Sequence, residues 1–243
     1  MPQTFRSFIF MKRCAFYLLF LFALSGHSQT GEDIDKAELY ENYREDQFYF
    51  SVTYNLLNNS PSGVSQSGFS SGIHLGFIRD MPVNPRRNVA IGLGLGLSSN
   101  SYNQNLLIEA TNQETIFSVI DKDELNVSKN KFTTYLIELP LEFRWRTSTA
   151  LDYNFWRIYT GFKLGYVFYN STRLKSDQGD LNQSNLDAFN DFQYGLTLSA
   201  GYGTWNFHMY YGLNTIFDSS SKLESGNSLD LKSFKIGLIF YIL

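Results

Sequence analysis

Cysteine is almost absent from this sequence. The only cysteine among the 243 residues is Cys14, which lies in an N-terminal segment that looks like a removable export signal. The remainder of the chain can therefore form no disulfide bond and no thiolate metal site.

Long apolar runs are also missing. Beyond the N-terminal segment the chain has no stretch of about 18 apolar residues, so no membrane-spanning helix is predicted. Hydrophobic residues make up 43% of the chain, and the mean hydropathy is −0.22. These values argue against a helical membrane protein but not against a membrane β-barrel. Half of the side chains in a barrel strand face a polar interior, so such a protein looks soluble by composition.

The N-terminus has the parts of a secretory signal peptide. Lys12 and Arg13 form a basic region, residues 14–24 are an apolar run, and residues 25–28 place small side chains before a cleavage point. The apolar run is too short to cross a bilayer. We therefore predict that residues 1–28 are a signal peptide.

Positive charge is in the minority. The chain has 20 Lys and Arg against 23 Asp and Glu, and residues 1–28 hold three of the cations and no acid. Removal of the signal leaves 17 cations against 23 acids, a formal charge of −6, which argues against nucleic acid as a partner. Residues 29–46 are acidic and poor in apolar side chains, so we expect a flexible tail there, with a short helix as the alternative.

Strict alternation of side-chain character is the dominant pattern after residue 46. Because side chains alternate faces along a strand, each such segment has one face of large apolar residues and one of glycine and polar residues. In residues 233–243 the apolar set runs from Phe234 to Ile242, and the other set contains Lys235 and Gly237. Eight segments show this pattern: 47–56, 69–77, 89–98, 135–146, 156–168, 192–202, 205–217 and 233–243.

The connections between these segments alternate between long and short: residues 99–130 and 170–190 are long, and residues 79–88 form a shorter turn. This is the rule for outer-membrane barrels, which have long outer loops and tight periplasmic turns. We predict an eight-stranded antiparallel transmembrane β-barrel over residues 47–243 in the outer membrane of a Gram-negative bacterium. Both termini would be periplasmic, and the last strand would pair with the first. On this topology an aromatic belt falls at the periplasmic strand ends, on the lipid-facing set: Trp145, Trp156 and Trp205.

The inward set carries charges that must be paired, because desolvating a lone charge costs several kcal/mol. We expect a salt-bridge network in which Lys163, Arg157 and Lys235 pair with Glu138 and Glu142. The partner of Lys235 would be one of these two carboxylates. We interpret the network as a structural filling of a narrow barrel. An ion path, or an acid–base pair involving a histidine, is the alternative. No metal-ligand spacing and no catalytic motif occurs, so no cofactor, metal or catalytic residue is predicted. The network would comprise Glu138, Glu142, Arg144, Arg157, Lys163, Lys235, His74 and His208.

Residues 135–143 (YLIELPLEF) resemble the Y-L-E-(I/L)-P-L signature of small outer-membrane barrels common in Bacteroidetes. Residues 161–166 (GFKLGY) resemble the following strand of those barrels, and residues 234–243 resemble the closing one. Together with residues 76–98 and the acidic tail, the chain resembles the PorT-like barrels of the type IX secretion system. The resemblance implies a non-catalytic part in protein secretion, and in gliding motility, through contacts with other envelope proteins.

Two other functions stay open at this stage. A small porin or channel is the first, although eight strands with a charge-filled interior argue against diffusion. A membrane-embedded enzyme is the second, and it has little support because the long outer loops contain acids but no histidine. For the secretion role we expect outer-membrane lipid and envelope proteins as partners, and neither nucleic acid nor a small-molecule substrate.

Overall fold

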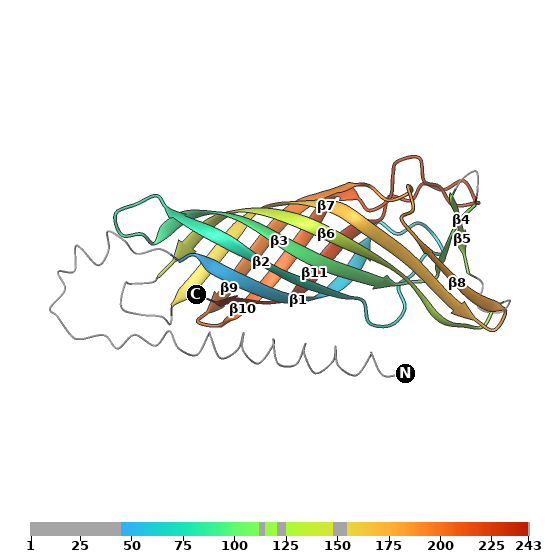
Figure 1. The fold of residues 1–243 in the computed structure, drawn as a ribbon, viewed down its shortest axis with the longest axis horizontal. Coiled ribbons are helices and arrows are strands. Elements are labelled where there is room, and N and C mark those ends of the chain that lie inside the picture. Colours follow the sequence, from blue (N-terminus) through green and yellow to red (C-terminus); the bar gives the residue numbers. More distant parts are fainter. Residues whose placement is uncertain (1–44, 112–114, 121–124, 148–154, 243) are drawn as a thin grey trace, which may run out of the picture. The chain divides into compact units, whose positions relative to one another are not determined.

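The computed structural model describes residues 45–242, except for 112–114, 121–124 and 148–154. The expected signal peptide and most of the acidic tail, residues 29–46, lie outside the described residues. The described chain is built from strands (Figure 1): β1 (Gln47–Asn58), β2 (Ser71–Pro82), β3 (Val89–Asn103), β4 (Leu106–Ala110), β5 (Thr115–Val119), β6 (Val127–Arg146), β7 (Trp156–Ser176), β8 (Gly179–Ser184), β9 (Phe192–Tyr202), β10 (Trp205–Thr215) and β11 (Lys232–Ile242).

Eight of these strands close into an antiparallel barrel. The order is β1, β2, β3, β6, β7, β9, β10 and β11, and β11 returns to pair with β1. At this seam Phe48 lies opposite Ile242, and Val52 lies opposite Leu238. The predicted fold class and the predicted seam are therefore confirmed.

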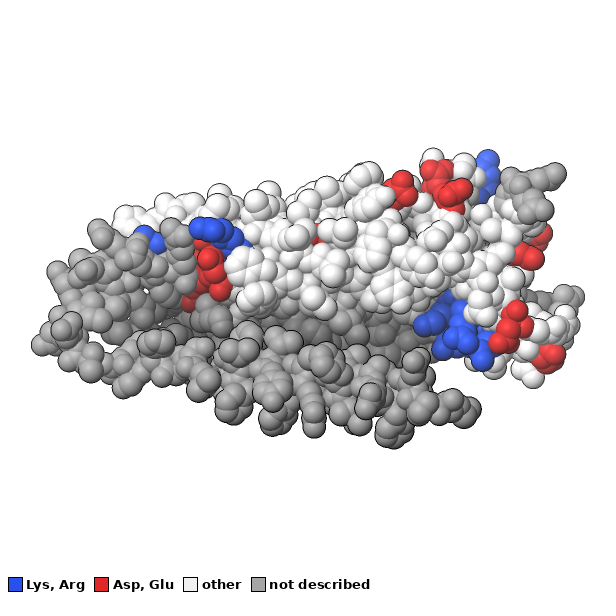
Figure 2. Space-filling model, viewed as in Figure 1, with Lys and Arg blue, Asp and Glu red and all other residues white. Residues whose placement is uncertain are grey.

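The wall of the barrel has an apolar outer face and a polar inner face. Side chains of the inward set, such as Ser51 and Thr53, are buried. Figure 2 shows the middle of the visible barrel face almost without charged side chains. Among the described residues no helix is long and apolar enough to cross a membrane. Each barrel strand contributes large exposed apolar side chains, one per strand being Phe48, Leu75, Leu95, Leu139, Phe162, Leu196, Phe207 and Leu238.

The two ends of the barrel differ. At one end, here called the turn end, the short connections 83–88 and 203–204 join neighbouring strands, and β1 begins and β11 ends there. At the opposite end, here called the loop end, β6 and β7 extend well beyond the lipid-facing part, with 20 and 21 residues. A tilted strand needs only about 9–11 residues to cross a bilayer.

The loop end contains strands that the sequence pattern did not predict. Residues 99–130 were expected to be one long connection, but β3 continues to Asn103, β4 and β5 form a hairpin, and β6 begins at Val127. Within 170–190, β8 pairs with the end of β7. These segments lie outside the lipid-facing part, so they lack the apolar outer face that marked the other strands.

The loops at this end fold onto one another around an aromatic cluster. The ring of Phe217 lies 5.3 Å from Phe117, 5.4 Å from Phe132 and 4.8 Å from Phe189, measured between centroids. These residues come from four different segments, so their packing ties the loops into one cap. The buried apolar side chains of this cap are Val64, Tyr102, Leu106, Ile108, Phe117, Phe132, Leu186, Phe189, Ile216, Phe217, Leu223, Leu229 and Leu231.

The closing seam requires glycine at position 237. A Cβ there would overlap the carbonyl oxygen of Val52 and the Cα of Thr53, both of which belong to the backbone of β1. We expect Gly237→Ala to lower the free energy of unfolding by about 1–3 kcal/mol, because the seam must shift to admit the methyl group. Urea unfolding of the refolded barrel in lipid vesicles measures this.

Gly165→Ala is the matched control, since Gly165 also faces inward. A Cβ at that position would come closest to the flexible end of the Leu136 side chain, at 2.7 Å. The side chain can rotate away, so we expect a smaller loss. Equal losses for the two variants would contradict the seam argument.

Candidate functional site in the barrel interior

The barrel interior holds two groups of charged side chains. Each is carried by strands whose inward set alternates with the lipid-facing set, so the charges of different strands converge on one lumen. The first group lies near the middle of the strands around Glu138, and the second lies at the turn end around Asp80. We call them the central cluster and the turn-end cluster.

The central cluster is centred on the carboxylate of Glu138, on β6. The Nδ1 atom of His74, on β2, lies 3.1 Å from its Oε1 atom. The Nζ atom of Lys163, on β7, donates to its Oε2 atom at 3.1 Å. All three side chains are buried. One carboxylate therefore joins β2, β6 and β7 across the lumen.

Lys235 and His208 occupy the same region but have other neighbours. Lys235 was expected to pair with Glu138 or Glu142, yet it forms no ion pair with any described residue, and the charge of Glu138 acts on it only at longer range. Its Nζ atom lies 4.7 Å from the ring centroid of Tyr210, its cross-strand partner. That partner is adjacent, whereas Glu138 is already engaged by two other groups. The Nδ1 atom of His208 is 2.8 Å from the hydroxyl of Ser199.

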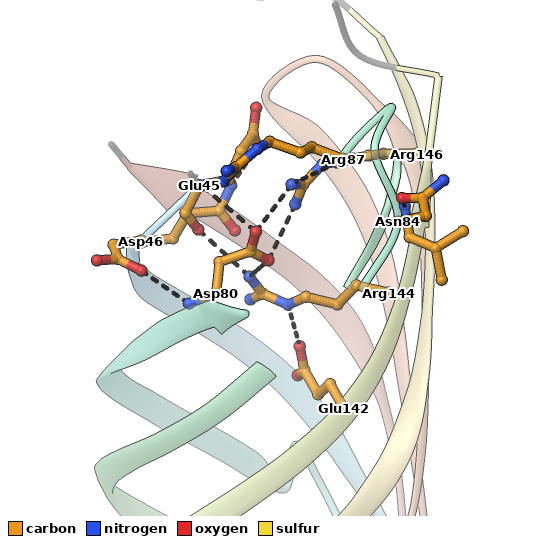
Figure 3. A network of polar contacts seen from close by, with 10 residues as sticks. Glu45, Asp46, Asp80, Asn84, Arg87, Glu142, Arg144 and Arg146 are labelled. Atoms are coloured by element: carbon orange, nitrogen blue, oxygen red, sulfur yellow. Dashed lines mark hydrogen bonds and ion pairs between the residues drawn. The ribbon is translucent and has the colours of Figure 1, made fainter. Parts of the chain in front are cut away.

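The turn-end cluster is built around Asp80, on β2 (Figure 3). Both guanidinium Nη atoms of Arg146 donate to this carboxylate, at 2.9 and 2.8 Å. Arg144 donates to it at 3.0 Å. Asp80 and the two arginines have almost no exposed surface. Two buried cations therefore share one buried carboxylate.

The chain that leads into β1 is part of this cluster. The backbone N–H of Asp80 donates to Oδ1 of Asp46 at 2.7 Å, and the carbonyl of Glu45 accepts from Arg144 at 3.3 Å. Arg146 also donates to the carbonyl of Arg87, in the turn after β2, at 2.8 Å. Figure 3 shows these groups gathered around Asp80. The end of the expected tail and the first turn are thereby fixed to the barrel wall.

Asp80 is the residue that reasoning from the sequence missed. Its segment was read as the start of a connection, because the apolar alternation stops after Phe77. The strand in fact continues to Pro82. Asp80 has the same parity as His74 and Ile78, so a longer strand would have placed it in the lumen.

Glu142 and Arg157 do not pair with each other, and the predicted partners of both were wrong. Glu142 accepts from Arg144 Nε at 3.1 Å, two residues along the same strand and on the same face, and not from Arg157 or Lys235. The guanidinium of Arg157 stacks instead on aromatic rings, 4.5 Å from the centroid of Phe155 and 5.4 Å from that of Tyr241. The expected single network is therefore two clusters with aromatic side chains around them.

Glycines on the inward set make room for the long side chains. A Cβ at Gly92 would lie 2.7 Å from Nε of Arg144, and one at Gly195 would lie 2.6 Å from the ring of Tyr210. A Cβ at Gly96 would overlap the hydroxyl of Tyr49. The lumen is consequently filled by Arg and Tyr side chains that cross it.

The chemistry open to this arrangement is limited. The carboxylates of Glu138 and Asp80 are each shared between two basic groups, and that of Glu142 is paired with Arg144. Within the described part of the chain no group of three or more His, Cys, Asp or Glu could hold a metal ion. These ion pairs link side chains of β2, β6 and β7, and so this arrangement suits a structural role in holding the strands together.

Comparison with known proteins identifies the family. The family model described as "Outer membrane protein beta-barrel domain" matches residues 27–218, which is most of the chain. The chain belongs to this family. A search of the curated proteins gave no match.

Two solved structures resemble this outer membrane beta-barrel protein at low identity. Both are of Ail, the attachment invasion locus protein of Yersinia pestis, and both are 13% identical to the chain. For the first the TM-score is 0.33, with 81% of this chain and 96% of that chain covered. The second is a complex with the heparin analogue sucrose octasulfate, with a TM-score of 0.34 and coverages of 82% and 97%.

Membership in an outer membrane barrel family places lipid against the apolar outer face. Trp145, Trp156 and Trp205 all lie on that face at the turn end, and each is exposed. The ring of Trp156 packs against Tyr202, and that of Trp205 against Phe240, both with centroids 5.4 Å apart. Amphipathic rings favour the boundary between lipid and water.

Proposed function

We propose that this outer membrane barrel is not an enzyme and acts through contacts with other envelope proteins. The observation that carries the proposal is the filled lumen. If solutes cannot pass through the interior, the barrel can act through its surfaces. These surfaces are the cap at the loop end, the turns, and the tail before β1, and we propose that they bind other envelope proteins.

The filling of the lumen argues against a diffusion pore. A porin needs a water-filled channel. Here Arg144, Arg146 and Tyr159 are among the largest side chains with almost no exposure, and all three point into the barrel. Opening a path would break ion pairs that are already desolvated, at a cost of about 3–5 kcal/mol for each pair broken.

The process we propose is type IX protein secretion, together with gliding motility where the cell glides. This assignment rests on the resemblance of residues 135–143 and 161–166 to the PorT-like barrels of Bacteroidetes. We further propose that the turn end faces the periplasm. The even number of barrel strands then leaves the acidic tail on the same side as the short turns.

Deletion of the gene tests the secretion role. We expect the deletion strain to retain type IX cargo inside the cell, whereas uptake of small solutes stays unchanged because the barrel conducts none. Cargo in the medium is measured by immunoblot, and solute uptake by the hydrolysis rate of a periplasmic reporter substrate. Normal cargo export in a clean deletion strain would overturn the proposal.

Planar-bilayer recording of the purified barrel separates this role from that of a channel. We expect no large steady openings from the wild-type protein. Large steady openings would instead favour a porin.

A further inference from the structure

Four cations lie side by side on the outer face of the barrel at the loop end. They are Lys129 and Lys131 on β6 and Arg173 and Lys175 on β7. On β6 the two lysines share the parity of the lipid-facing residues below them. On β7 a bulge next to Tyr169 changes the outward parity, so that Arg173 and Lys175 also face outward. Figure 2 shows a group of Lys and Arg side chains at the end where β6, β7 and β8 extend. We call these residues the cationic patch.

The cations of the patch face each other directly across the two strands. Lys129 lies opposite Lys175, and Lys131 lies opposite Arg173. Like charges in directly opposed positions destabilise a sheet. Among the described residues the one ion pair of the patch joins Lys175 to Asp180, at 3.6 Å. The patch therefore concentrates positive charge at a cost to the sheet.

An aromatic band lies immediately below the patch. Tyr135, on β6, packs against Phe168 and Tyr169, on β7, with ring centroids 6.4 and 5.6 Å away. All three are exposed on the lipid-facing side. Aromatic rings of this kind mark the boundary of the hydrocarbon region. Lys131 is four residues further along a tilted strand, which raises it about 10 Å above the band, at the level of lipid headgroups.

A polar depression opens between these two features. It has a volume of about 330 Å³, and its walls include Lys131 and Arg173. The rest of its lining is mostly hydroxyl and amide groups, among them Thr133, Ser171 and Gln183, with Tyr135 and Tyr169 on the lower side. The partial burial of Lys131, together with the charges of Lys129 and Arg173, lowers the pKa of Lys131 below its usual value. An anion bound here would relieve that repulsion.

We propose that the cationic patch binds the phosphate of an anionic glycolipid headgroup in the outer leaflet of the outer membrane. Arg and Lys are the side chains that hold phosphate, Arg through paired hydrogen bonds. The hydroxyl and amide groups of the depression suit the sugar that carries the phosphate, and the aromatic band sets the depth of its acyl chains. The inference rests on the outer-membrane placement of the barrel and on the proposed periplasmic position of its turn end, and not on its role in secretion.

Lipid retention by the purified full-length barrel tests the inference. The protein is reconstituted in phosphatidylcholine nanodiscs that contain a minor fraction of either diphosphorylated or fully dephosphorylated lipid A. Retained lipid A is then counted by native mass spectrometry. We expect the wild type to prefer the diphosphorylated form, and Lys131→Gln with Arg173→Gln to reduce its retention about tenfold, the loss of roughly one charge-assisted contact.

Two further variants keep the test decisive. Arg79→Gln with Arg86→Gln removes the same charge from exposed positions at the turn end and should leave retention unchanged. Lys131→Arg with Arg173→Lys keeps the charges and should preserve binding. Equal retention of both lipids by the wild type, or equal losses in the two Gln variants, would overturn the proposal. Displacement of lipid A by inorganic phosphate alone would overturn the assignment to a lipid headgroup.

Discussion

Glu138→Gln is expected to lower the free energy of unfolding of the barrel by about 3–5 kcal/mol, because it leaves buried cations without their carboxylate. Glu138 engages both His74 and Lys163, at 3.1 Å each. The charge of Glu138 also acts on Lys235, at longer range. The amide of Gln can still accept a hydrogen bond, but it cannot balance the positive charge of Lys163. Urea unfolding of the refolded barrel in lipid vesicles, followed by tryptophan fluorescence, measures the loss.

Two companion variants show whether the loss comes from the ion pair. Glu109→Gln changes an exposed carboxylate on β4 and should alter stability by no more than about 0.5 kcal/mol. The double variant Glu138→Gln with Lys163→Gln should lose less than the sum of the single variants, with a coupling of about 0.5–3 kcal/mol. Additive losses would show that the pair does not join β6 to β7.

Asp80→Asn is expected to lower the free energy of unfolding by a similar amount, about 3–5 kcal/mol, through the turn-end cluster. Asp80 is the shared acceptor of Arg144 and Arg146, and all three side chains are buried. Loss of its charge removes the carboxylate that these two buried guanidinium groups share, and Arg144 keeps only its ion pair with Glu142. We expect the barrel to lose its resistance to unfolding by SDS at a lower temperature than the wild type, as seen by its mobility on a gel.

Asp46→Asn provides the control for this cluster. Oδ1 of Asp46 accepts a hydrogen bond from the backbone N–H of Asp80, and the carbonyl oxygen of an Asn side chain can replace it. We expect little change in the unfolding temperature. An equal loss in Asp46→Asn and Asp80→Asn would contradict this prediction. It would show that the stability of the turn end does not depend specifically on the charge of the buried Asp80.

The stability of the central and turn-end clusters bears on function. Ion pairs that join β2, β6 and β7 inside the lumen hold the barrel in one closed form, so we expect partners to meet a rigid outer surface. The cap at the loop end extends this surface beyond the membrane, since Phe117, Phe132, Phe189 and Phe217 fasten four segments together. Substitutions at the surface of the cap can therefore test for partner contacts without disturbing the lumen.

The sequence alone was enough to predict the barrel itself. A strand in lipid must alternate between an apolar outward face and a small or polar inward face, so the pattern marks each spanning strand. It also fixed the parity of each side chain, which placed Glu138, Lys163 and His74 in one lumen before any contact was known. The seam between β11 and β1 followed from closure, because an open edge has no place in hydrocarbon.

The tertiary structure alone decided which inward side chains meet. Partners depend on register across strands that are far apart in sequence, and parity carries no information about register. For this reason Lys235, on β11, lies opposite Tyr210 on β10. Glu142 pairs with Arg144 on its own strand because the two residues share one face and lie close together. Asp80 joined the site because β2 runs past the end of its apolar pattern.

The loop end was likewise decided by tertiary structure. No lipid imposes an alternation there, so β4, β5 and β8 carried no signal that the sequence pattern could detect. The four cations of the patch are scattered in sequence between Lys129 and Lys175. Only the pairing of β6 with β7 brings them together above the aromatic band.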